Sequence, residues 1–218
     1  MKHSPAQRDQ GFVTPAYDAA VDSLCTAIAR WHRDGATVIG LSGAQGTGKS
    51  TLALHLLDAL AARHGLRGCI LSLDDLYLTH SARLGLSKRV HPLFITRGVP
   101  GTHDAMLGLA LIKTLLATDS ESEVAIPRFV KAIDDRAPIS DWHRVQGPID
   151  IVLFEGWCLG VGPVDADEDG APINALEASE DAEGLWRTYI ERELLGPYAD
   201  LFARLDRLGF LQVPDFEQ

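Results

Sequence analysis

Cysteines, basic residues and long apolar runs are all scarce in this sequence, and each shortage excludes a class of protein. The 218 residues include three cysteines, Cys25, Cys69 and Cys158. They are odd in number and widely spaced, so they form neither a disulfide framework nor a zinc-binding pattern, and we predict reduced thiols. No apolar run reaches about 18 residues, and the N-terminal residues lack the apolar core of a signal peptide. These features predict a soluble, cytoplasmic protein with no membrane partner.

The shortage of positive charge restricts which ligands the protein can bind. The chain has 20 Lys and Arg against 30 Asp and Glu, and its net charge is −10. Such a surface repels DNA and RNA, so no nucleic-acid partner is expected, and an anionic ligand must be met by a local basic site. A hydrophobic content of 46% over this length supports one domain with a full core. We predict a single domain over residues 1–218, with residues 1–15 polar and loose.

The first third of the chain shows the pattern of a βαβ unit. Apolar residues recur at helical spacing over residues 16–34 and again over residues 49–64. Short runs of apolar residues predict strands at 37–41 and 68–73, and a glycine-rich turn occupies residues 42–48. A strand, a turn, a helix and a second strand in this order imply a parallel sheet.

The remaining pattern continues this alternation. Further strands are expected at residues 123–129, 149–154 and 208–213. Helices are expected at residues 104–117 and 182–205, the latter with a break at Gly196 and Pro197. Three stretches read as loops, residues 77–101, 134–142 and 160–172, and the first of them is basic enough to be either a solvated loop or a ligand lid. The fold class predicted is a doubly wound α/β domain, a parallel sheet flanked by helices.

The strongest chemical signal is the sequence GAQGTGKS at residues 43–50, a full match to G-x-x-x-x-G-K-[ST]. Its glycines let backbone N–H groups curve around phosphate oxygens, and the following helix directs its positive end at them. Lys49 would bridge the β- and γ-phosphates of ATP, and Ser50 would bind Mg²⁺. A chance glycine turn would lack the apolar strand before it and the helix after it. The predicted nucleotide-binding residues are Gly43, Ala44, Gln45, Gly46, Thr47, Gly48, Lys49, Ser50 and Thr51.

Carboxylates follow two of the predicted strands. Glu155 ends the apolar strand at 149–154, where a carboxylate can hold Mg²⁺ beside a phosphate loop; alternatively it faces solvent. Asp74 and Asp75 end the strand at 68–73. Because ligands of open α/β sheets bind beyond the carboxyl ends of the strands, these two could act as a base, bind magnesium, or form an Asx turn.

Basic side chains occur in two later segments. Arg97 and His103 lie in one, and Arg128 and Lys131 lie in the other. Phosphoryl transfer requires positive charge near the transferred group, and an anionic substrate requires a counter-charge. Each of these residues could equally be an ordinary surface cation.

Taken in order, these segments resemble the D-glycerate 3-kinase family of P-loop kinases, which is related to uridine kinase, pantothenate kinase and phosphoribulokinase. The similar stretches are GLSGAQGTGKSTL (40–52), LSLDDLYLT (71–79), TRGVPGTHD (96–104), IPRFVKAIDDRAP (126–138), DIVLFEGWCLG (150–160) and parts of residues 185–216. The resemblance implies an ATP- and Mg²⁺-dependent kinase with a small-molecule substrate. It covers nearly the whole chain.

The resemblance also implies roles for single residues. Asp74 matches the position of the family's catalytic base, and Asp75 matches that of a second acid beside it. Glu155 matches the position of the family's metal-binding glutamate. Residues implied to bind the substrate are Tyr77, Arg97, His103, Asp104, Arg128 and Lys131. Two features depart from the family pattern: Val130 replaces an aspartate, and the chain ends at Gln218, before a helix that supplies an arginine in the relatives. Transfer without that arginine is expected to be slow or absent.

Three functions remain open from the sequence. The first is transfer of the γ-phosphate of ATP to D-glycerate. The second is the same chemistry on a uridine- or pantothenate-type hydroxyl. The third is an ATP-binding module without useful catalysis, which follows from the short C-terminus. A switch GTPase is disfavoured because the guanine-reading sequence Asn/Thr-Lys-x-Asp is missing. The oligomeric state is not encoded in any of these features.

Overall fold

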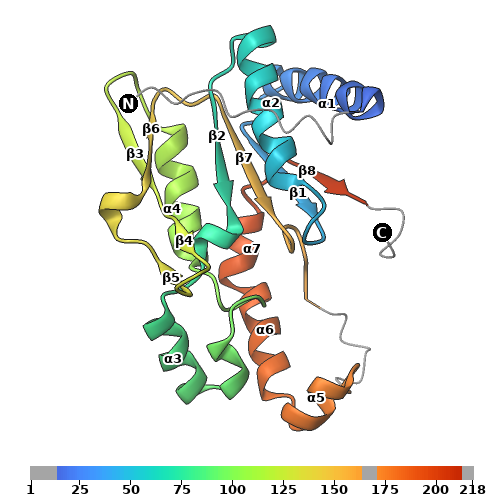
Figure 1. Cartoon of the computed structure of the whole chain (residues 1–218), viewed down its shortest axis with the longest axis vertical. Helices are drawn as coiled ribbons and strands as arrows, with labels where there is room; N and C mark the ends of the chain where they lie inside the picture. Colours follow the sequence, from blue (N-terminus) through green and yellow to red (C-terminus); the bar gives the residue numbers. More distant parts are fainter. Residues whose placement is uncertain (1–13, 164–170, 213–218) are drawn as a thin grey trace.

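The computed structural model describes residues 14–163 and 171–212, and its centre is a four-stranded parallel sheet in the order β2-β7-β1-β8 (Figure 1). The strands are β1 (Val38–Gly43), β2 (Gly68–Ser72), β7 (Ile151–Gly156) and β8 (Arg207–Leu211). Strands β1 and β7 are buried along their whole length. Apart from Ser42 and Glu155 near their carboxyl ends, their sequences are therefore apolar rather than alternating, as is typical of central parallel strands.

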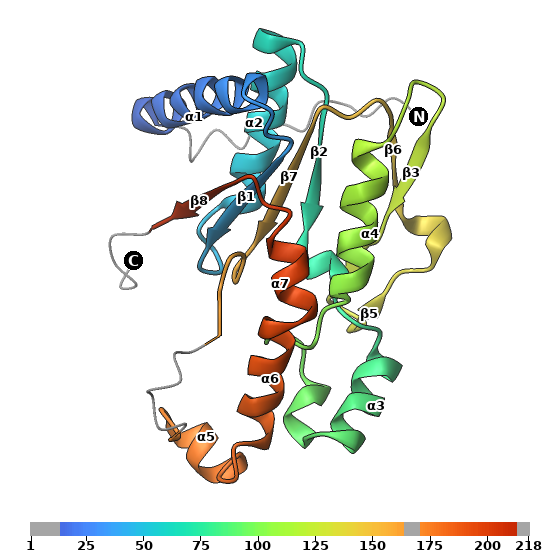
Figure 2. The ribbon, with the colours of Figure 1, turned by 180° about the vertical axis from the view of Figure 1, so that it is seen from behind.

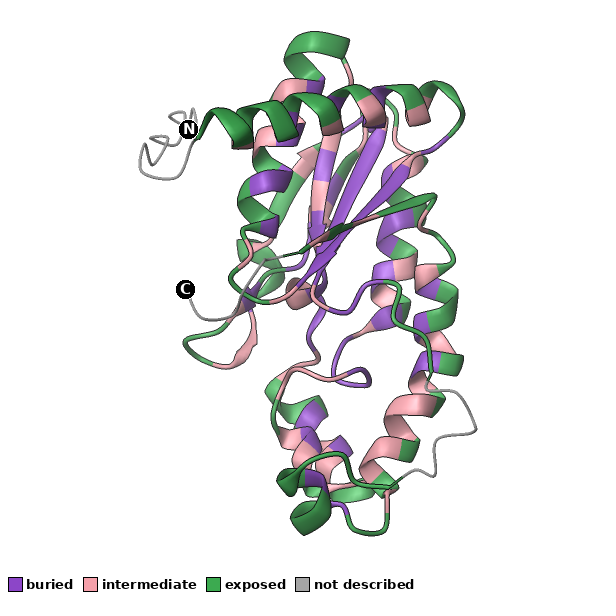
Figure 3. Cartoon of the chain, turned by 90° about the vertical axis from the view of Figure 1, so that its right-hand side faces the viewer, coloured by how far each residue is buried: buried purple, intermediate pink, exposed green. Residues whose placement is uncertain are grey.

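Helices cover both faces of this sheet, which confirms the predicted doubly wound α/β fold (Figures 1 and 2). Helices α1 (Pro15–Arg33) and α2 (Lys49–His64) pack on one face, and α4 (Ala105–Leu116) and α7 (Pro197–Phe202) pack on the other. Successive residues of β7 alternate between the two cores, because side chains of a strand point to opposite faces. Figure 3 shows the buried sheet between the helices, whose outer faces are exposed.

The first two helices are bounded by Thr14, which was not singled out from the sequence, and by Gly65, the predicted end of α2. The hydroxyl of Thr14 accepts a hydrogen bond from the Tyr17 amide at 3.1 Å and so caps α1. Gly65 ends α2 with a φ of 66°, in the left-handed region that favours glycine. Both helices lie within one residue of the bounds predicted for them.

Below the carboxyl ends of the strands lie short helices, and here the prediction was wrong (Figure 1). Residues 77–101 were expected to be irregular, yet they contain α3 (His80–Arg89) and the 3₁₀ helix η2 (Pro92–Ile95). Helix α3 is capped by Thr79, whose hydroxyl accepts from the Ala82 amide at 3.2 Å. Its sequence has no apolar stripe, so its periodicity gave no helical signal.

The expected strand at 123–129 and the expected loop at 134–142 also need correction. Strand β3 (Glu123–Ile126) pairs with β6 (His143–Gln146) in a separate antiparallel sheet, and β4 (Phe129–Val130) pairs with β5 (Asp135–Arg136). The 3₁₀ helix η3 (Ile139–Asp141) follows β5. Pro127 separates β3 from β4 because proline has no N–H for a strand ladder. Short strands of this kind depend on partners that a local pattern does not show.

The C-terminal third is close to the prediction. The helical region expected at 182–205 consists of α6 (Leu185–Leu195) and α7, and it breaks at Gly196 as expected. A short helix, α5 (Ala175–Glu180), was not predicted. The expected loose segment at 1–15, the loop at 160–172 and the strand end at Val213 fall wholly or partly outside the described residues. Among the helices at residues 14–163 and 171–212, none has the length and apolar character needed to cross a membrane.

Candidate active site

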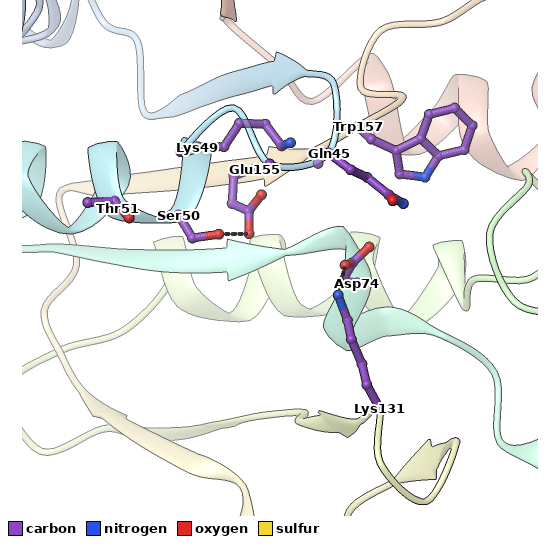
Figure 4. A pocket seen from close by; sticks show the side chains of 11 residues that line it. Gln45, Lys49, Ser50, Thr51, Asp74, Lys131, Glu155 and Trp157 are labelled. Carbon is purple, nitrogen blue, oxygen red and sulfur yellow. Dashed lines mark hydrogen bonds and ion pairs between the residues drawn. The ribbon is translucent and has the colours of Figure 1, made fainter. Parts of the chain in front are cut away.

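A cavity of about 370 Å³ opens where the carboxyl ends of β1, β2 and β7 meet (Figure 4). Its lining comes from the glycine-rich loop and α2, the end of β2, the β4–β5 turn and the end of β7: Gln45, Gly46, Gly48, Lys49, Ser50, Thr51, Asp74, Lys131, Glu155, Gly156 and Trp157. Residues from four predicted segments therefore share one cavity. It lies at the edge of the sheet where open α/β folds bind their ligands.

The glycine-rich loop has the backbone geometry of a phosphate-binding loop. Gly43 has a φ of 155°, and a Cβ there would lie 2.8 Å from the carbonyl oxygen of Leu211, so only glycine fits. Gly48 precedes α2 in the left-handed conformation, with a φ of 81°, and no side chain caps the helix. The first N–H groups of α2 are therefore free of side-chain acceptors and suit the oxygens of a phosphate.

Lys49 lies over the inner curve of this loop. Its side chain is buried, and Nζ donates to the carbonyl oxygens of Gly43 at 2.9 Å and Ala44 at 2.8 Å. The hydroxyl of Thr47 also donates to the carbonyl of Ala44, at 2.9 Å. Gly43, Ala44 and Thr47 thus shape the loop from behind, whereas the other predicted nucleotide-binding residues line the cavity.

Glu155 occupies the position that the sequence predicts for a magnesium-binding carboxylate. Its Oε1 accepts hydrogen bonds from the hydroxyls of Ser50 at 3.0 Å and Ser72 at 2.8 Å, and the residue is buried (Figure 4). Burial excludes the alternative of a solvent-facing strand end. Hydroxyl and carboxylate oxygens fit Mg²⁺, which takes few protein ligands and completes its shell with phosphates and water. The described residues contain no cluster of three His, Cys, Asp or Glu that would hold a metal alone.

Asp74 faces the same cavity from the opposite wall. Its Oδ2 accepts from Nζ of Lys131 at 2.7 Å, and Figure 4 shows the two side chains side by side. Both are partly exposed, so this pair contributes at most about 1 kcal/mol to stability. The contact therefore adds little to stability, and it places a positive charge beside the Asp74 carboxylate at the cavity.

Asp75 points elsewhere, although it is the next residue. Its Oδ1 accepts the backbone N–H of Phe129 at 2.8 Å. Burial raises the pKa of Asp75, the charges of Asp74 and Glu155 raise it further, and the Phe129 bond and Arg128 only partly offset these effects. Asp75 and Arg128 line a second groove of about 650 Å³ beside β2, outside the cleft that holds Asp74. This geometry favours Asp74 as the base and gives Asp75 the task of holding β4.

Arg97 belongs to a group of charges beside the β4–β5 turn. Its Nη1 donates to Oδ1 of Asp134, and the Nη2 of Arg83 donates to Oδ2 of the same carboxylate at 2.7 Å. Both guanidinium carbons lie 5.6 Å from the ring centroid of Phe129, a cation–π distance. Sequence reasoning assigned no role to Arg83 or Asp134. The only signal was the acidic pair at Asp134 and Asp135 within a family-like segment.

Tyr77 and His103 pack against each other near Asp74, outside the residues that line the cavity. Their rings stack with centroids 4.3 Å apart, and their backbones form a bridge. Burial lowers the pKa of His103 to about 3, despite the opposing charge of Asp74, so the ring is neutral at physiological pH. Asp104, expected to bind substrate, instead caps α4 by accepting the Leu107 amide at 3.0 Å. That task explains an aspartate at this position without a ligand.

Known proteins similar to this chain are kinases. No protein-family model matches the chain. It is 37% identical over 168 residues to a chloroplastic D-glycerate 3-kinase of Arabidopsis thaliana, an alignment that covers 71% of this chain and 36% of the relative. It is 38% identical over 187 residues to an uncharacterized kinase of Schizosaccharomyces pombe, with 82% of this chain and 65% of the relative covered. The chain thus spans about a third of the plant protein and just under two thirds of the yeast one.

Solved structures agree with these similarities. A D-glycerate 3-kinase from Cryptococcus neoformans superposes with a TM-score of 0.73 at 29% identity, covering 94% of this chain and 75% of that one. A possible uridine kinase from Bacillus stearothermophilus, 17% identical, has a TM-score of 0.51 with 88% of this chain and 97% of that one covered, and it shares the fold alone. The resemblance predicted from the sequence is confirmed, and the fold is that of the P-loop kinases.

Proposed function

We propose that this chain, a relative of the D-glycerate 3-kinases, is an ATP-dependent kinase that phosphorylates a hydroxyl group of D-glycerate. One observation carries the proposal: Lys49, Ser50 and Glu155 share a cavity with the Asp74 carboxylate. A phosphate-binding loop alone would indicate only a nucleotide-binding protein. A carboxylate on the opposite wall adds the group that a phosphoryl transfer needs at its acceptor.

In this proposal the loop and α2 bind the phosphates of ATP. The backbone N–H groups at the start of α2 donate to phosphate oxygens, and Nζ of Lys49 exchanges its two carbonyl partners for the β- and γ-phosphates. Ser50 and Glu155 would hold Mg²⁺, which neutralises charge on the phosphates when bound. The hydrogen bond from Ser72 keeps the Glu155 carboxylate in place.

The transfer step follows from the position of Asp74. The acceptor hydroxyl forms a bond from its oxygen to the γ-phosphorus, and the bond between that phosphorus and the leaving oxygen of ADP breaks. Asp74 accepts the hydroxyl proton, and Lys131 holds the carboxylate at 2.7 Å in the direction of the cavity. Lys49 stabilises the negative charge that is spread over the transferred group.

The charges on the acceptor side support an anionic acceptor. Lys131 lines the cavity beside Asp74, and the partly exposed Arg97 is paired with Asp134 of the β4–β5 turn that carries Lys131. In a chain with a net charge of −10 this is a local basic site. A guanidinium recognises a carboxylate well, and D-glycerate carries one. The names of the Arabidopsis and Cryptococcus proteins support the same acceptor.

An acceptor screen tests the proposal. Purified protein is given ATP and Mg²⁺ with D-glycerate, uridine or pantothenate, and ADP release is followed by a coupled assay. We expect turnover with D-glycerate and its loss in the Lys49→Ala and Asp74→Asn variants. Phosphorylation of uridine without phosphorylation of glycerate would contradict the acceptor assignment. Tight ATP binding without any transfer would show a nucleotide-binding module instead of a kinase.

Two further predictions remain proposals. We propose that the chain acts as one domain, because β7 contributes residues to the hydrophobic cores on both faces of the sheet. We also propose a reducing location such as the cytoplasm, because Cys25, Cys69 and Cys158 are free and buried. The plant relative is named as chloroplastic. Cell fractionation of the native host tests the location.

A further inference from the structure

Tyr198 lies in a stretch that resembles the kinase family but was assigned no role from the sequence, and its hydroxyl makes three contacts near the site. It is fully buried on α7. Its hydroxyl oxygen accepts the backbone N–H of Gly101 at 2.9 Å and that of His103 at 3.2 Å. The same oxygen lies 2.7 Å from Nδ1 of His103. One atom of α7 therefore contacts the loop at residues 101–103 in three ways.

These contacts determine which nitrogen of His103 carries the hydrogen. A phenol oxygen has two lone pairs and one proton. The two backbone N–H groups use the lone pairs, so the Tyr198 proton is donated to Nδ1 of His103. Nδ1 is then an acceptor, and the hydrogen of the neutral ring is assigned to Nε2, a buried nitrogen with no hydrogen-bond partner among the described residues. A hydrogen on Nδ1 would face the Tyr198 hydroxyl oxygen, whose two lone pairs already accept the backbone N–H groups of Gly101 and His103.

The loop and His103 are in turn coupled to Asp74. The His103 ring stacks on Tyr77. The backbone on either side of His103 also pairs with residues 76–78, which follow Asp74. The Leu78 N–H donates to the Thr102 carbonyl at 2.9 Å, and the Asp104 N–H donates to the Leu76 carbonyl at 2.7 Å. The Asp74 carboxylate lies near the Tyr77 hydroxyl, and its negative charge, after burial, raises the pKa of Tyr77. A continuous set of contacts thus joins Tyr198 to the proposed base.

We propose that Tyr198 is a positioning residue for phosphoryl transfer. Its single hydroxyl fixes the loop at residues 101–103 and the Nε2–H form of His103, and these hold Tyr77 and the Asp74 carboxylate in the direction of the cleft. The inference rests on the proposed kinase function and adds to it a residue that touches neither ATP nor the acceptor. Rotation of a base by a small amount is enough to slow proton transfer, because the reaction needs close alignment.

The first test removes only the hydroxyl. Tyr198→Phe keeps the buried ring, and we expect it to lower kcat by roughly tenfold or more while the KM for ATP stays at its wild-type value. Tyr189→Phe is the matched control. Tyr189 lies on α6 against the same loop, since a Cβ on Gly101 would come within 2.9 Å of its ring, but its hydroxyl interacts with Glu193 and Arg192 of its own helix. This control is expected to keep the wild-type kcat.

A double-mutant cycle separates positioning from general loosening. If Tyr198 acts through His103, the losses of kcat in Tyr198→Phe and His103→Gln are not additive, because the second substitution removes a link that is already broken. Additive losses would show that the two residues act independently, and that result would overturn the proposal. Thermal unfolding of each variant checks that all are folded at the assay temperature.

The tautomer is read without any enzyme assay. We expect ¹⁵N NMR of the wild-type His103 ring to show hydrogen on Nε2 and none on Nδ1, and Tyr198→Phe to show a mixture of both forms. Hydrogen on Nδ1 in the wild type, or a Tyr198→Phe variant with full kcat, would overturn the proposal.

A wild-type protein that transfers phosphate to no acceptor would refute the kinase function and, with it, the role of Tyr198 in transfer. An active wild type with an equally active Tyr198→Phe would refute only the positioning role.

Discussion

The two walls of the cleft are built in different ways. The nucleotide wall comes from consecutive residues, 43–50, whose backbone curves around a position for phosphate and whose Lys49 donates to two carbonyl oxygens of that loop. The acceptor wall comes from side chains distant in the sequence, Asp74 with Lys131, 57 residues apart. Residues outside the cavity lining support this wall through pairs such as His103 with Tyr198, 95 residues apart. Phosphate recognition is thus a property of local backbone geometry, whereas acceptor recognition depends on tertiary packing.

The largest effect is expected on the nucleotide wall. Lys49→Ala removes the cation that stabilises the transferred phosphoryl group, and we expect kcat/KM to fall by about 10³-fold, close to the upper end for one charge-stabilising donor. Lys113→Ala on the exposed side of α4 is the matched control and should keep full activity. Steady-state kinetics with saturating acceptor measure both. An active Lys49→Ala variant would mean that phosphate binds elsewhere.

On the acceptor wall, the two adjacent aspartates are expected to differ. Asp74→Asn keeps the shape but removes the base, and we expect kcat to fall by about 10²–10³-fold. Asp75→Asn leaves an amide oxygen that can still accept the Phe129 N–H, so its kcat should stay near that of the wild type. Equal losses in both variants, or a larger loss in Asp75→Asn, would show that the base is assigned wrongly.

The charge group beside Phe129 is expected to affect stability. Asp134→Ala leaves the fully buried Arg83 without its carboxylate, and because Asp134 is itself 36% exposed we expect a loss of about 2–3 kcal/mol, below the usual cost of breaking a buried pair. Glu123→Ala, which breaks a solvent-exposed pair with Arg144, should cost less than about 1 kcal/mol. Urea unfolding of the three proteins measures the difference. Equal losses would mean that Arg83 finds another partner.

The smallest effect concerns the ionisation of Asp75. Burial raises the pKa of Asp75 in the folded protein, so its charge penalises the folded state at neutral pH. The penalty is full above the folded pKa, shrinks as pH falls through that value, and vanishes below the unfolded pKa. We therefore expect the Tm of Asp75→Asn to equal or exceed that of the wild type at pH 7, with any advantage lost in acid. A Tm below that of the wild type at pH 7 would show that the carboxylate is stabilising.

Most of the sheet could be predicted because its elements carry local signals. Residues 151–154 are buried and therefore read as an unbroken apolar run, and Gly65 marks the end of α2. Helix α3 could not be predicted, because its burial depends on Arg83, a charged residue whose partner lies in the β4–β5 turn. Strand β3 pairs with β6, about twenty residues later in the chain, so the local sequence pattern of either strand could not predict this pairing either.

The same division applies to the candidate site. The loop, Glu155 and Asp74 could be predicted because each follows a recognisable strand, and the structure brings them into one cavity. Of the residues that the resemblance places with the substrate, Lys131 lines this cavity, whereas Asp104 caps a helix and Arg128 lines a separate groove. Tyr198 could not be found, because its role depends on three hydrogen bonds that form only when α7 packs against the loop at residues 101–103.

The central claim, that a phosphate loop and an anion-binding acceptor wall together make a kinase, has a direct test. Protein, ATP and Mg²⁺ are mixed with equal amounts of D-glycerate and uridine, and ³¹P NMR follows the γ-phosphate. We predict that its signal moves to phosphoglycerate in step with the appearance of ADP, and that uridine stays unmodified. Appearance of the phosphate on uridine, or only as inorganic phosphate, would contradict the account.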